Sequence, residues 1–260
     1  MPSLSFLGTG SGIPSSERYF PCTLVHLDRL RLLVDAGEPC VHLLRERGAI
    51  IQEIDAILIT HGHVDHIGGV PAFLQGAMLY GRTKPLSIHL PQEMISPLRA
   101  WISALYLPES GLGFSINWMP WDPASPLLWE GVTVTPQANG HLELCYRGLL
   151  DADSSKACQS YSLAIEQGDF RLVFSGDLAN SSELSPLLSK PATVLVCELS
   201  HITPEELAGE LAKADLKTLC LVHLSEDLVG DREDLQSKME EILPAIQDVM
   251  IPEDGSVIDF

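Results

Sequence analysis

A cluster of histidines and an aspartate lies within the stretch L-I-T-H-G-H-V-D-H-I-G-G at residues 58–69. Three histidines and one aspartate fall within six residues, namely His61, His63, Asp65 and His66. Neutral imidazole is the commonest protein ligand for zinc-like ions, and carboxylate is its usual complement. His61 and His63 are two positions apart, so a looped backbone can aim both at one ion, whereas Asp65 and His66 suit a second ion nearby. The stretch therefore predicts a metal site rather than a chance group of polar residues.

The residues around this cluster predict a strand before it and a helix after it. Ile54 and residues 56–59 form a short apolar run, typical of a buried strand, and the histidines begin where the run stops. Gly62 leaves the backbone free to turn between the first two ligands. Residues 70–79 are expected to be a helix, with Pro71 in the first turn. The cluster thus follows the end of a strand.

Strands and helices alternate along most of the chain. Further strands are expected at residues 4–7, 23–26, 31–34, 86–90, 132–135, 161–166, 171–174, 193–198, 219–222 and 257–260. Further helices are expected at residues 41–47, 93–106 and 235–243, and another after a capping box formed by Thr203 and Glu206. Residues 111–126 are expected to be irregular.

Polar residues capable of chemistry recur at or just after the ends of these expected strands. They are Asp35, His61, His141, Asp177, His201 and His223. In layered α/β architectures the ligand site gathers at strand ends, so we expect these residues to converge. Glu198 and His201 could form an oriented acid–base pair, or His201 could be only a polar residue before the helix that begins near Pro204. The remaining histidines, at 26, 42 and 89, are expected to be structural or surface residues.

Composition limits the partners and the compartment that we expect. The 260 residues carry a net charge of −19, which repels polyanions and disfavours nucleic acid as a partner. No run of 18 apolar residues is present, so no membrane span is expected. The six cysteines are scattered without a C-x-x-C pair, and the first residues lack the basic region of a signal peptide. These features predict a reduced, cytoplasmic protein.

The sequence resembles the ribonuclease Z-like branch of the metallo-β-lactamase superfamily nearly from end to end. The pattern H-x-H-x-D-H at residues 61–66 resembles the superfamily signature. Five further stretches of the sequence resemble motifs of that branch. They lie at residues 6–16 (F-L-G-T-G-S-G-I-P-S-S), 34–39 (V-D-A-G-E-P), 175–177 (S-G-D), 200–207 (S-H-I-T-P-E-E-L) and 221–225 (L-V-H-L-S). The resemblance implies an α/β fold in one domain over residues 1–260. That fold would be an αββα sandwich, with two mixed β-sheets flanked by helices and a metal site at one edge.

The resemblance also implies a role for each candidate residue. One metal ion would be held by His61, His63 and His141, and a second by Asp65, His66 and His223. Asp177 would bridge the two ions together with a water or hydroxide. Zinc suits this set of ligands, although manganese or iron fits as well. Asp65 would orient the hydroxide or accept its proton, and His201, paired with Glu198, would donate a proton to the leaving oxygen.

Two departures from the ribonuclease Z pattern shape the expected substrate. Glu226 and Asp227 stand near the position where that pattern has an arginine, and thirty-five residues separate His141 from Asp177, too few for a long tRNA-gripping arm. We therefore expect a dinuclear phosphodiesterase that uses a metal-bridging hydroxide on a small or non-tRNA phosphodiester. The alternatives are a lactonase, thioesterase or arylsulfatase of the same fold, or a non-catalytic metal-dependent ligand-binding module. A homodimer is left open.

Overall fold

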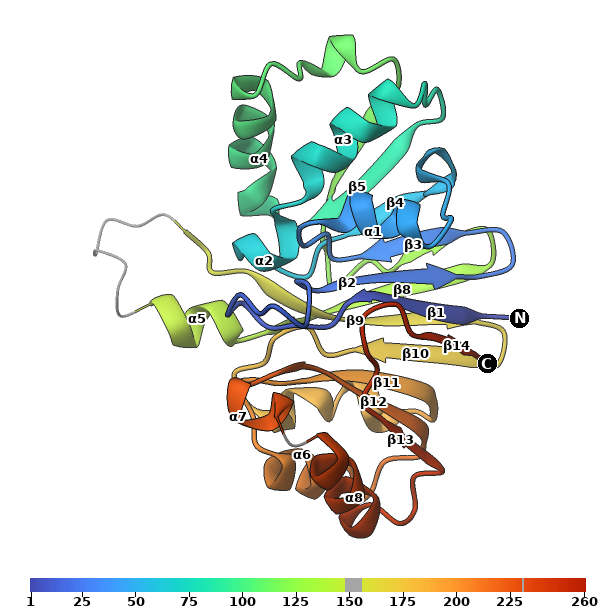
Figure 1. The fold of residues 1–260 in the computed structure, drawn as a ribbon, viewed down its shortest axis with the longest axis vertical. Coiled ribbons are helices and arrows are strands. Elements are labelled where there is room, and N and C mark those ends of the chain that lie inside the picture. Colours follow the sequence, from blue (N-terminus) through green and yellow to red (C-terminus); the bar gives the residue numbers. More distant parts are fainter. Residues whose placement is uncertain (148–155, 231) are drawn as a thin grey trace. The chain divides into compact units, whose positions relative to one another are not determined.

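The computed structural model of the protein describes residues 1–147, 156–230 and 232–260. The chain forms two compact units (Figure 1). Unit 1 comprises Met1–Trp121 and Glu253–Asp259, and unit 2 comprises Asp122–Pro252 with Phe260. Each unit contains one seven-stranded sheet and its own helices. This confirms the α/β class with two mixed sheets, while the expectation of a single domain stays a prediction.

Unit 1 is built on a sheet with the strand order β14-β1-β2-β3-β4-β5-β6. In that order the strands are Val257–Asp259, Ser3–Gly8, Cys22–His26, Arg31–Val34, Ala56–Leu58, Leu86–Leu90 and Ile116–Pro120. β14, β1, β2 and β3 pair antiparallel, and β3 to β6 pair parallel. The strands expected at residues 23–26 and 31–34 are present as β2 and β3, which pair antiparallel as a hairpin. Every residue of β4 is buried, which is typical of a central parallel strand and places the start of the histidine loop on a rigid element.

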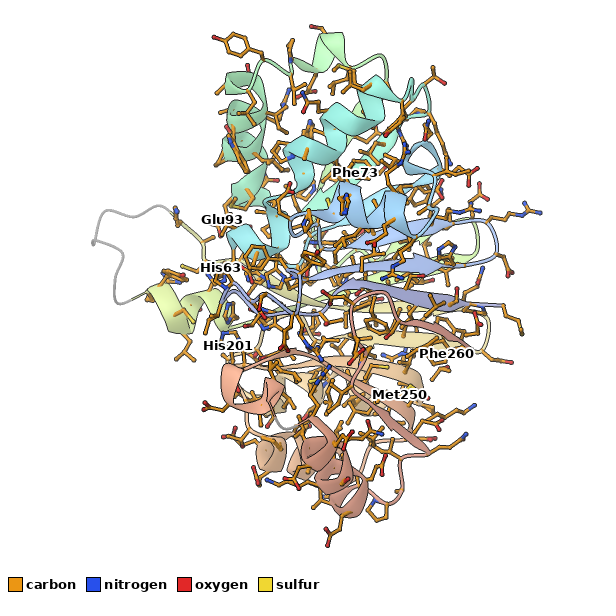
Figure 2. All side chains as sticks on the ribbon, viewed as in Figure 1. His63, Phe73, Glu93, His201, Met250 and Phe260 are labelled. Carbon is orange, nitrogen blue, oxygen red and sulfur yellow. The ribbon has the colours of Figure 1, made fainter. Side chains whose placement is uncertain are left out.

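The helices of unit 1 cover its sheet with apolar side chains. They are α1 (Cys40–Glu46), α2 (Val64–Ile67), α3 (Val70–Leu79) and α4 (Gln92–Ala104), with short 3₁₀ turns at Ile51–Glu53 and Glu109–Gly111. In α3, Val70, Phe73, Leu74 and Ala77 recur at helical spacing and are buried. Phe73, labelled in Figure 2, belongs to the core that also includes Ile57 of β4. This packing fixes the two ends of the segment that carries the histidines.

Unit 2 is built on a sheet with the strand order β13-β12-β11-β10-β9-β8-β7. In that order the strands are Asp248–Met250, Leu216–Leu224, Ala192–Leu199, Phe170–Phe174, Ser160–Gln167, Val132–Asn139 and Leu127–Trp129. β7 to β10 pair antiparallel, and β10 to β13 pair parallel. The central strands β10 and β11 are almost wholly buried. The polar residues of interest follow β8, β10 and β11 or lie near the end of β12, as the strand-end argument predicts.

The helices of unit 2 are α5 (His141–Tyr146), α6 (Pro204–Leu211), α7 (Glu226–Val229) and α8 (Arg232–Ile242), with 3₁₀ turns at Ser181–Leu184 (η3) and Leu187–Ser189 (η4). The predicted capping box is present, because the Thr203 hydroxyl accepts from the Glu206 amide and the Glu206 carboxylate accepts from the Thr203 amide. Leu207 of α6 and Met239 of α8 are buried in the core with Leu195 of β11. The helix start therefore fixes the end of the loop that contains His201.

Three strands of the structure were not expected from the sequence, and all three are edge strands. Residues 111–126 are not irregular throughout, because Ile116–Pro120 pairs with β5. β7 and β13 were also not expected, and they form the two edges of the unit 2 sheet. Edge strands expose much of their surface, so their apolar pattern is weak, and β6 exposes Asn117, Met119 and Pro120. A proline is tolerated at such an edge because one side of the strand needs no ladder partner.

The remaining composition-based expectations concern the cysteines and the membrane. All six cysteines are free thiols, and Cys197 and Cys220 are core residues of unit 2 strands, as expected. Burial raises the pKa of the Cys220 thiol to about 12. Among residues 1–147, 156–230 and 232–260, no helix combines the length and the apolar character that a bilayer crossing requires.

Candidate metal centre

The unit 1 cluster consists of His61, His63, Asp65 and His66. β4 ends at Leu58, His61 lies on the following loop, and His63 is the residue that caps the start of α2. Asp65 and His66 lie within α2. Gly62 serves close packing here, because a Cβ at this position would lie 2.7 Å from the sulfur of Met94. The loop is thus pressed against the start of α4, and the four candidate ligands share one short segment.

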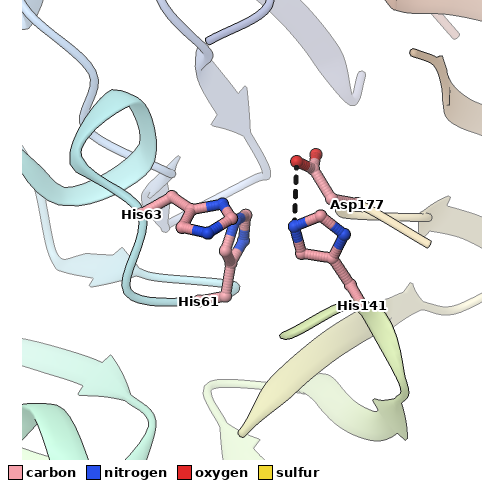
Figure 3. Close-up of side chains that lie close together, drawn as sticks. All are labelled: His61, His63, His141 and Asp177. Carbon is pink, nitrogen blue, oxygen red and sulfur yellow. Dashed lines mark hydrogen bonds and ion pairs between the residues drawn. The ribbon is translucent and has the colours of Figure 1, made fainter. Parts of the chain in front are cut away.

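The donor atoms of the unit 1 cluster form two pairs. His61 Nε2 and His63 Nδ1 are 2.9 Å apart, and Figure 3 shows the two imidazoles beside each other. His66 Nε2 lies 3.3 Å from Asp65 Oδ2. His61, Asp65 and His66 are buried. Imidazole nitrogens and a carboxylate oxygen gathered in this way fit a zinc-like divalent ion.

Asp35 connects two of the candidate ligands of unit 1, a role that the sequence did not assign. Its Oδ2 lies 2.7 Å from His66 Nδ1, and its Oδ1 accepts from the Thr60 amide at 2.8 Å. The Thr60 hydroxyl donates to Asp35 and lies 3.1 Å from His61 Nδ1. A carboxylate on the far nitrogen of a ligand histidine fixes its tautomer and ring orientation. The signal in the sequence was the place of Asp35 at a strand end, where it adopts a φ of 55° that aspartate tolerates.

The unit 2 cluster consists of His141, Asp177, His201 and His223. His141 is the first residue of α5, directly after Gly140, and Asp177 follows β10. The two carboxylate oxygens of Asp177 face different histidines. Oδ2 lies 3.6 Å from His141 Nε2, the ion pair dashed in Figure 3, and Oδ1 lies 3.7 Å from His223 Nε2. A carboxylate with two histidines on opposite oxygens is suited to bridging.

His223 lies inside a strand rather than after one, which corrects the predicted end of this strand at residue 222. β12 continues to Leu224, and its pairing with β11 skips His223. His223 has a φ of 50°, so it is the extra residue of a β-bulge. Bulges re-aim side chains near functional sites. The Ser200 hydroxyl donates to the His223 carbonyl at 2.6 Å and lies 3.1 Å from His223 Nδ1. The other ring nitrogen, His223 Nε2, faces Asp177.

Glu198 and His201 are brought together as the sequence suggested. His201 Nδ1 lies 3.3 Å from Glu198 Oε2 and 3.9 Å from Asp177 Oδ2. Glu198 is buried, and its Oε2 also accepts from the backbone amides of Ser200 and His201. Donor atoms of Asp177, His201 and His223 all lie within 4.8 Å of one another. This geometry suits His201 either as an acid held by Glu198 or as a further ligand.

The other histidines have no place in these clusters. His26 ends β2 and His42 lies on α1, while His89 is buried in β5. The His89 ring lies 5.2 Å from the ring of Trp121, whose indole N–H donates to the Ile59 carbonyl at 2.7 Å. Burial lowers the pKa of His89 from 6.5 to about 4, so this side chain is neutral at neutral pH. The expectation that these three histidines have a structural or surface role stays a prediction.

Comparison with known proteins identifies the family. The sequence profile of the anti-Pycsar protein Apyc1 family matches residues 2–240. The chain belongs to the anti-Pycsar protein Apyc1 family. The match includes both the unit 1 cluster and the unit 2 cluster, so every candidate ligand lies within the part of the chain that defines membership.

Relatives of this Apyc1 family member include proteins named ribonuclease Z. That of Methanopyrus kandleri is 41% identical over 80 residues, which is 30% of this chain and 29% of that protein. That of Metallosphaera sedula is 25% identical over 296 aligned residues, covering 100% of this chain and 99% of that protein. The chain spans less than a third of the length of the first relatives that it matches. The ribonuclease activity in these names therefore belongs to those proteins.

A solved structure confirms the fold. The metallo-β-lactamase fold protein YhfI from Bacillus subtilis superposes with a TM-score of 0.77 at 20% sequence identity, covering 99% of this chain and 98% of that one. At this identity the likeness concerns the fold alone. Together with the ribonuclease Z relatives, it confirms the predicted membership in the ribonuclease Z-like part of the metallo-β-lactamase superfamily.

Proposed function

We propose that the protein is a dinuclear metal-dependent hydrolase that cleaves a small or non-tRNA phosphodiester. The observation that carries the proposal is Asp177, whose two oxygens face His141 at 3.6 Å and His223 at 3.7 Å. A carboxylate placed in this way can serve two cations at once. The donor set of each unit, imidazole with carboxylate, and the ribonuclease Z relatives support a metal-dependent hydrolase.

The resemblance to the superfamily assigns the candidate ligands to two metal ions. One ion would take His61, His63 and His141, a second would take Asp65, His66 and His223, and Asp177 would be shared. This division rests on the resemblance to the superfamily and on the strand-end position of the ligands, since each unit alone supplies only part of each set. Zinc fits these donors, and manganese or iron would fit the same nitrogens and oxygens.

The chain's own residues would supply orientation and proton transfer. Divalent ions, when bound, provide charge stabilisation and an acidified water. Asp65 would accept a hydrogen bond from the attacking water and set its direction. His201 would hold a proton on its imidazole and pass it to the leaving oxygen, while Glu198, 3.3 Å from His201 Nδ1, would keep the ring in place. Burial of Glu198 keeps this support away from competing water.

A phosphodiester is favoured over other esters because relatives carry the name ribonuclease Z, and RNA is itself a phosphodiester. A small substrate is favoured over tRNA by the net charge of −19 and by the thirty-five residues between His141 and Asp177. Part of that interval, residues 148–155, lies outside the described residues. The cytoplasmic location and the homodimer stay predictions from the sequence.

A panel of generic esters tests the reaction class. Protein purified with its metals would be incubated with a bis-aryl phosphate, an aryl phosphate, a lactone, an aryl sulfate and a thioester. We expect turnover of the bis-aryl phosphate to exceed that of the others and to disappear after a strong chelator. Preferred turnover of the lactone, thioester or sulfate would replace the phosphodiesterase by the corresponding enzyme of the same fold. Metal binding without turnover of any ester would leave a ligand-binding module.

Precursor tRNA provides a separate test of the substrate. Any weak cleavage of its 3′ trailer should vanish as salt rises from low to physiological concentration, because only phosphate contacts would hold the RNA. Efficient trimming that tolerates salt would restore tRNA processing as the function.

A further inference from the structure

Glu183 connects two chain segments that carry ligands of unit 2. It lies in the 3₁₀ turn η3 (Ser181–Leu184) and is half-buried. Its Oε1 accepts from the backbone amide of Gly140 at 2.6 Å, and its Oε2 accepts from that of Ala179 at 2.9 Å. Gly140 directly precedes His141, and Ala179 is two residues after Asp177. One carboxylate thus holds the start of α5 and the turn after β10 at a fixed separation.

The turn that carries Asp177 lies between two carboxylates. The amide of Leu178 donates to Glu198 Oε1 at 3.1 Å, and the next amide, that of Ala179, donates to Glu183. Glu198 connects this turn to Ser200 and His201. Glu183 connects it to His141. The backbone amides around Asp177 are therefore divided between a partner on the His201 side and a partner on the His141 side.

The glycine at position 140 fits this contact. A Cβ added to Gly140 would lie 3.1 Å from Glu183 Oε1, closer than side-chain atoms ordinarily approach. A larger residue would therefore push the carboxylate away from the Gly140 amide. The short 2.6 Å bond depends on the absence of a side chain at this position.

We propose that Glu183 is a positioning residue that sets the spacing of His141 and Asp177 for metal binding. Charge-assisted hydrogen bonds from backbone amides to a carboxylate are strong, so they resist independent movement of the two segments. With both bonds in place, His141 Nε2 and Asp177 Oδ2 are 3.6 Å apart, close enough to share one cation. The inference rests on the proposed function in that both residues bind metal.

Three substitutions with a matched control test the inference. Glu183→Gln keeps one carbonyl oxygen but turns an amide N–H₂ towards the other backbone N–H, and Glu183→Ala removes both acceptors. Gly140→Ala keeps Glu183 and displaces it. The control is Asn180→Ala, which removes the side-chain cap of the same 3₁₀ turn. The Asn180 side chain accepts from the Ser182 amide, whereas the amides of Gly140 and Ala179 donate to Glu183.

The readouts are the metal content of the purified protein and the metal affinity in competition with a chelator, each alongside a thermal unfolding curve. We expect Glu183→Gln and Gly140→Ala to weaken metal binding by about tenfold and Glu183→Ala by up to about 100-fold, the range typical of residues that support ligands. Asn180→Ala should lower the melting temperature with unchanged metal affinity. Should Glu183→Ala fail to fold, the other two variants carry the test.

The outcomes separate this inference from the proposed function. Wild-type protein that binds no divalent metal would overturn the proposed function itself. Wild-type protein that binds metal, with Glu183→Gln and Gly140→Ala no weaker than Asn180→Ala, would overturn only the positioning role of Glu183. Metal affinity that falls in the three test variants and not in the control supports both.

Discussion

The two clusters differ in how the chain brings their residues together. In unit 1, four candidate ligands lie within six residues on one loop and one helical turn. In unit 2, His141, Asp177 and His223 come from segments associated with three different strands, β8, β10 and β12. The first cluster needs little more than a loop with the right start and end. The second needs a sheet with the right strand order.

This difference appears in the residues that support each cluster. In unit 1, Asp35 contacts His66 directly and reaches His61 through Thr60. In unit 2, support is spread over several side chains from different segments, namely Glu183, Glu198 and Ser200. Distant segments lose more conformational freedom when they are held together, so they need more connections. Candidate ligands that come from separate strands are therefore accompanied by partners from two other segments, η3 and the end of β11.

The largest effect is expected when the shared carboxylate of unit 2 is removed. Asp177→Ala takes away an acceptor that faces both His141 and His223, whereas Asp65→Ala removes one that lies 3.3 Å from His66 Nε2. We expect Asp177→Ala to lose both ions and Asp65→Ala to lose at most one, because charge compensation is lost for two cations in the first case. Elemental analysis of protein never exposed to chelator measures the difference. Equal metal content in the two variants and the wild type would show that Asp177 has no bridging role.

The next effect concerns His201→Ala, a variant that tests whether His201 is a general acid or a metal ligand. His201→Ala should keep its metals and lower kcat by roughly 10²–10⁴, the usual contribution of a general acid. The loss should be smallest for a nitrophenolate leaving group and largest for a poor alkoxide leaving group. His42→Ala, on α1, is the control and should keep full activity. Loss of a metal from His201→Ala would make His201 a ligand, and full activity on every ester would leave it only a polar residue before α6.

A smaller effect tests whether metal binding by the unit 1 cluster depends on the Asp35 carboxylate. Asp35→Asn keeps an oxygen for Thr60 but presents an amide to His66 Nδ1, so the ring loses its acceptor. We expect metal affinity to fall by about 10–100-fold, as for other partners of ligand histidines. Asp28→Asn, at an exposed turn, should change nothing. If Asp35→Asn binds metal like wild type while the Glu183 variants do not, local chain geometry alone is enough to orient the candidate ligands of unit 1.

The smallest effect concerns the stability of unit 1 in mild acid. The pKa of His89 is lowered from 6.5 to about 4 by burial, so below pH 6.5 the unfolded chain takes up a proton that the folded chain refuses. The free energy of unfolding is therefore unaffected by protonation of His89 well above pH 6.5, and it decreases as the pH falls from 6.5 towards 4. The free energy of unfolding should drop by about 2 kcal/mol from pH 7 to pH 5 on this account. Urea titrations at both pH values should show a smaller drop for His89→Gln, and an identical drop would exclude His89 as the cause.

The sequence alone predicted the candidate ligands of unit 1 and the elements around them. A strand, a histidine-rich loop and a helix follow one another within residues 56–79, and local periodicity is enough to predict the strand and the helix. The capping box at Thr203 and Glu206 is local in the same way, and the structure contains it as predicted. The edge strands β6, β7 and β13 escaped prediction because their pairing partners, rather than their own residues, make them strands.

The tertiary structure decided the details that direct the ligands. Nothing near His223 in the sequence indicates a bulge, which arises because β12 pairs with β11 out of step at that residue. Likewise, Asp35 meets His66, and Glu183 meets both Gly140 and Ala179, only after their strands have taken their places in the sheets. Residue type and spacing along the chain determine which side chains can bind a metal. The distances between segments far apart in the sequence depend on sheet order and register, which local interactions do not set.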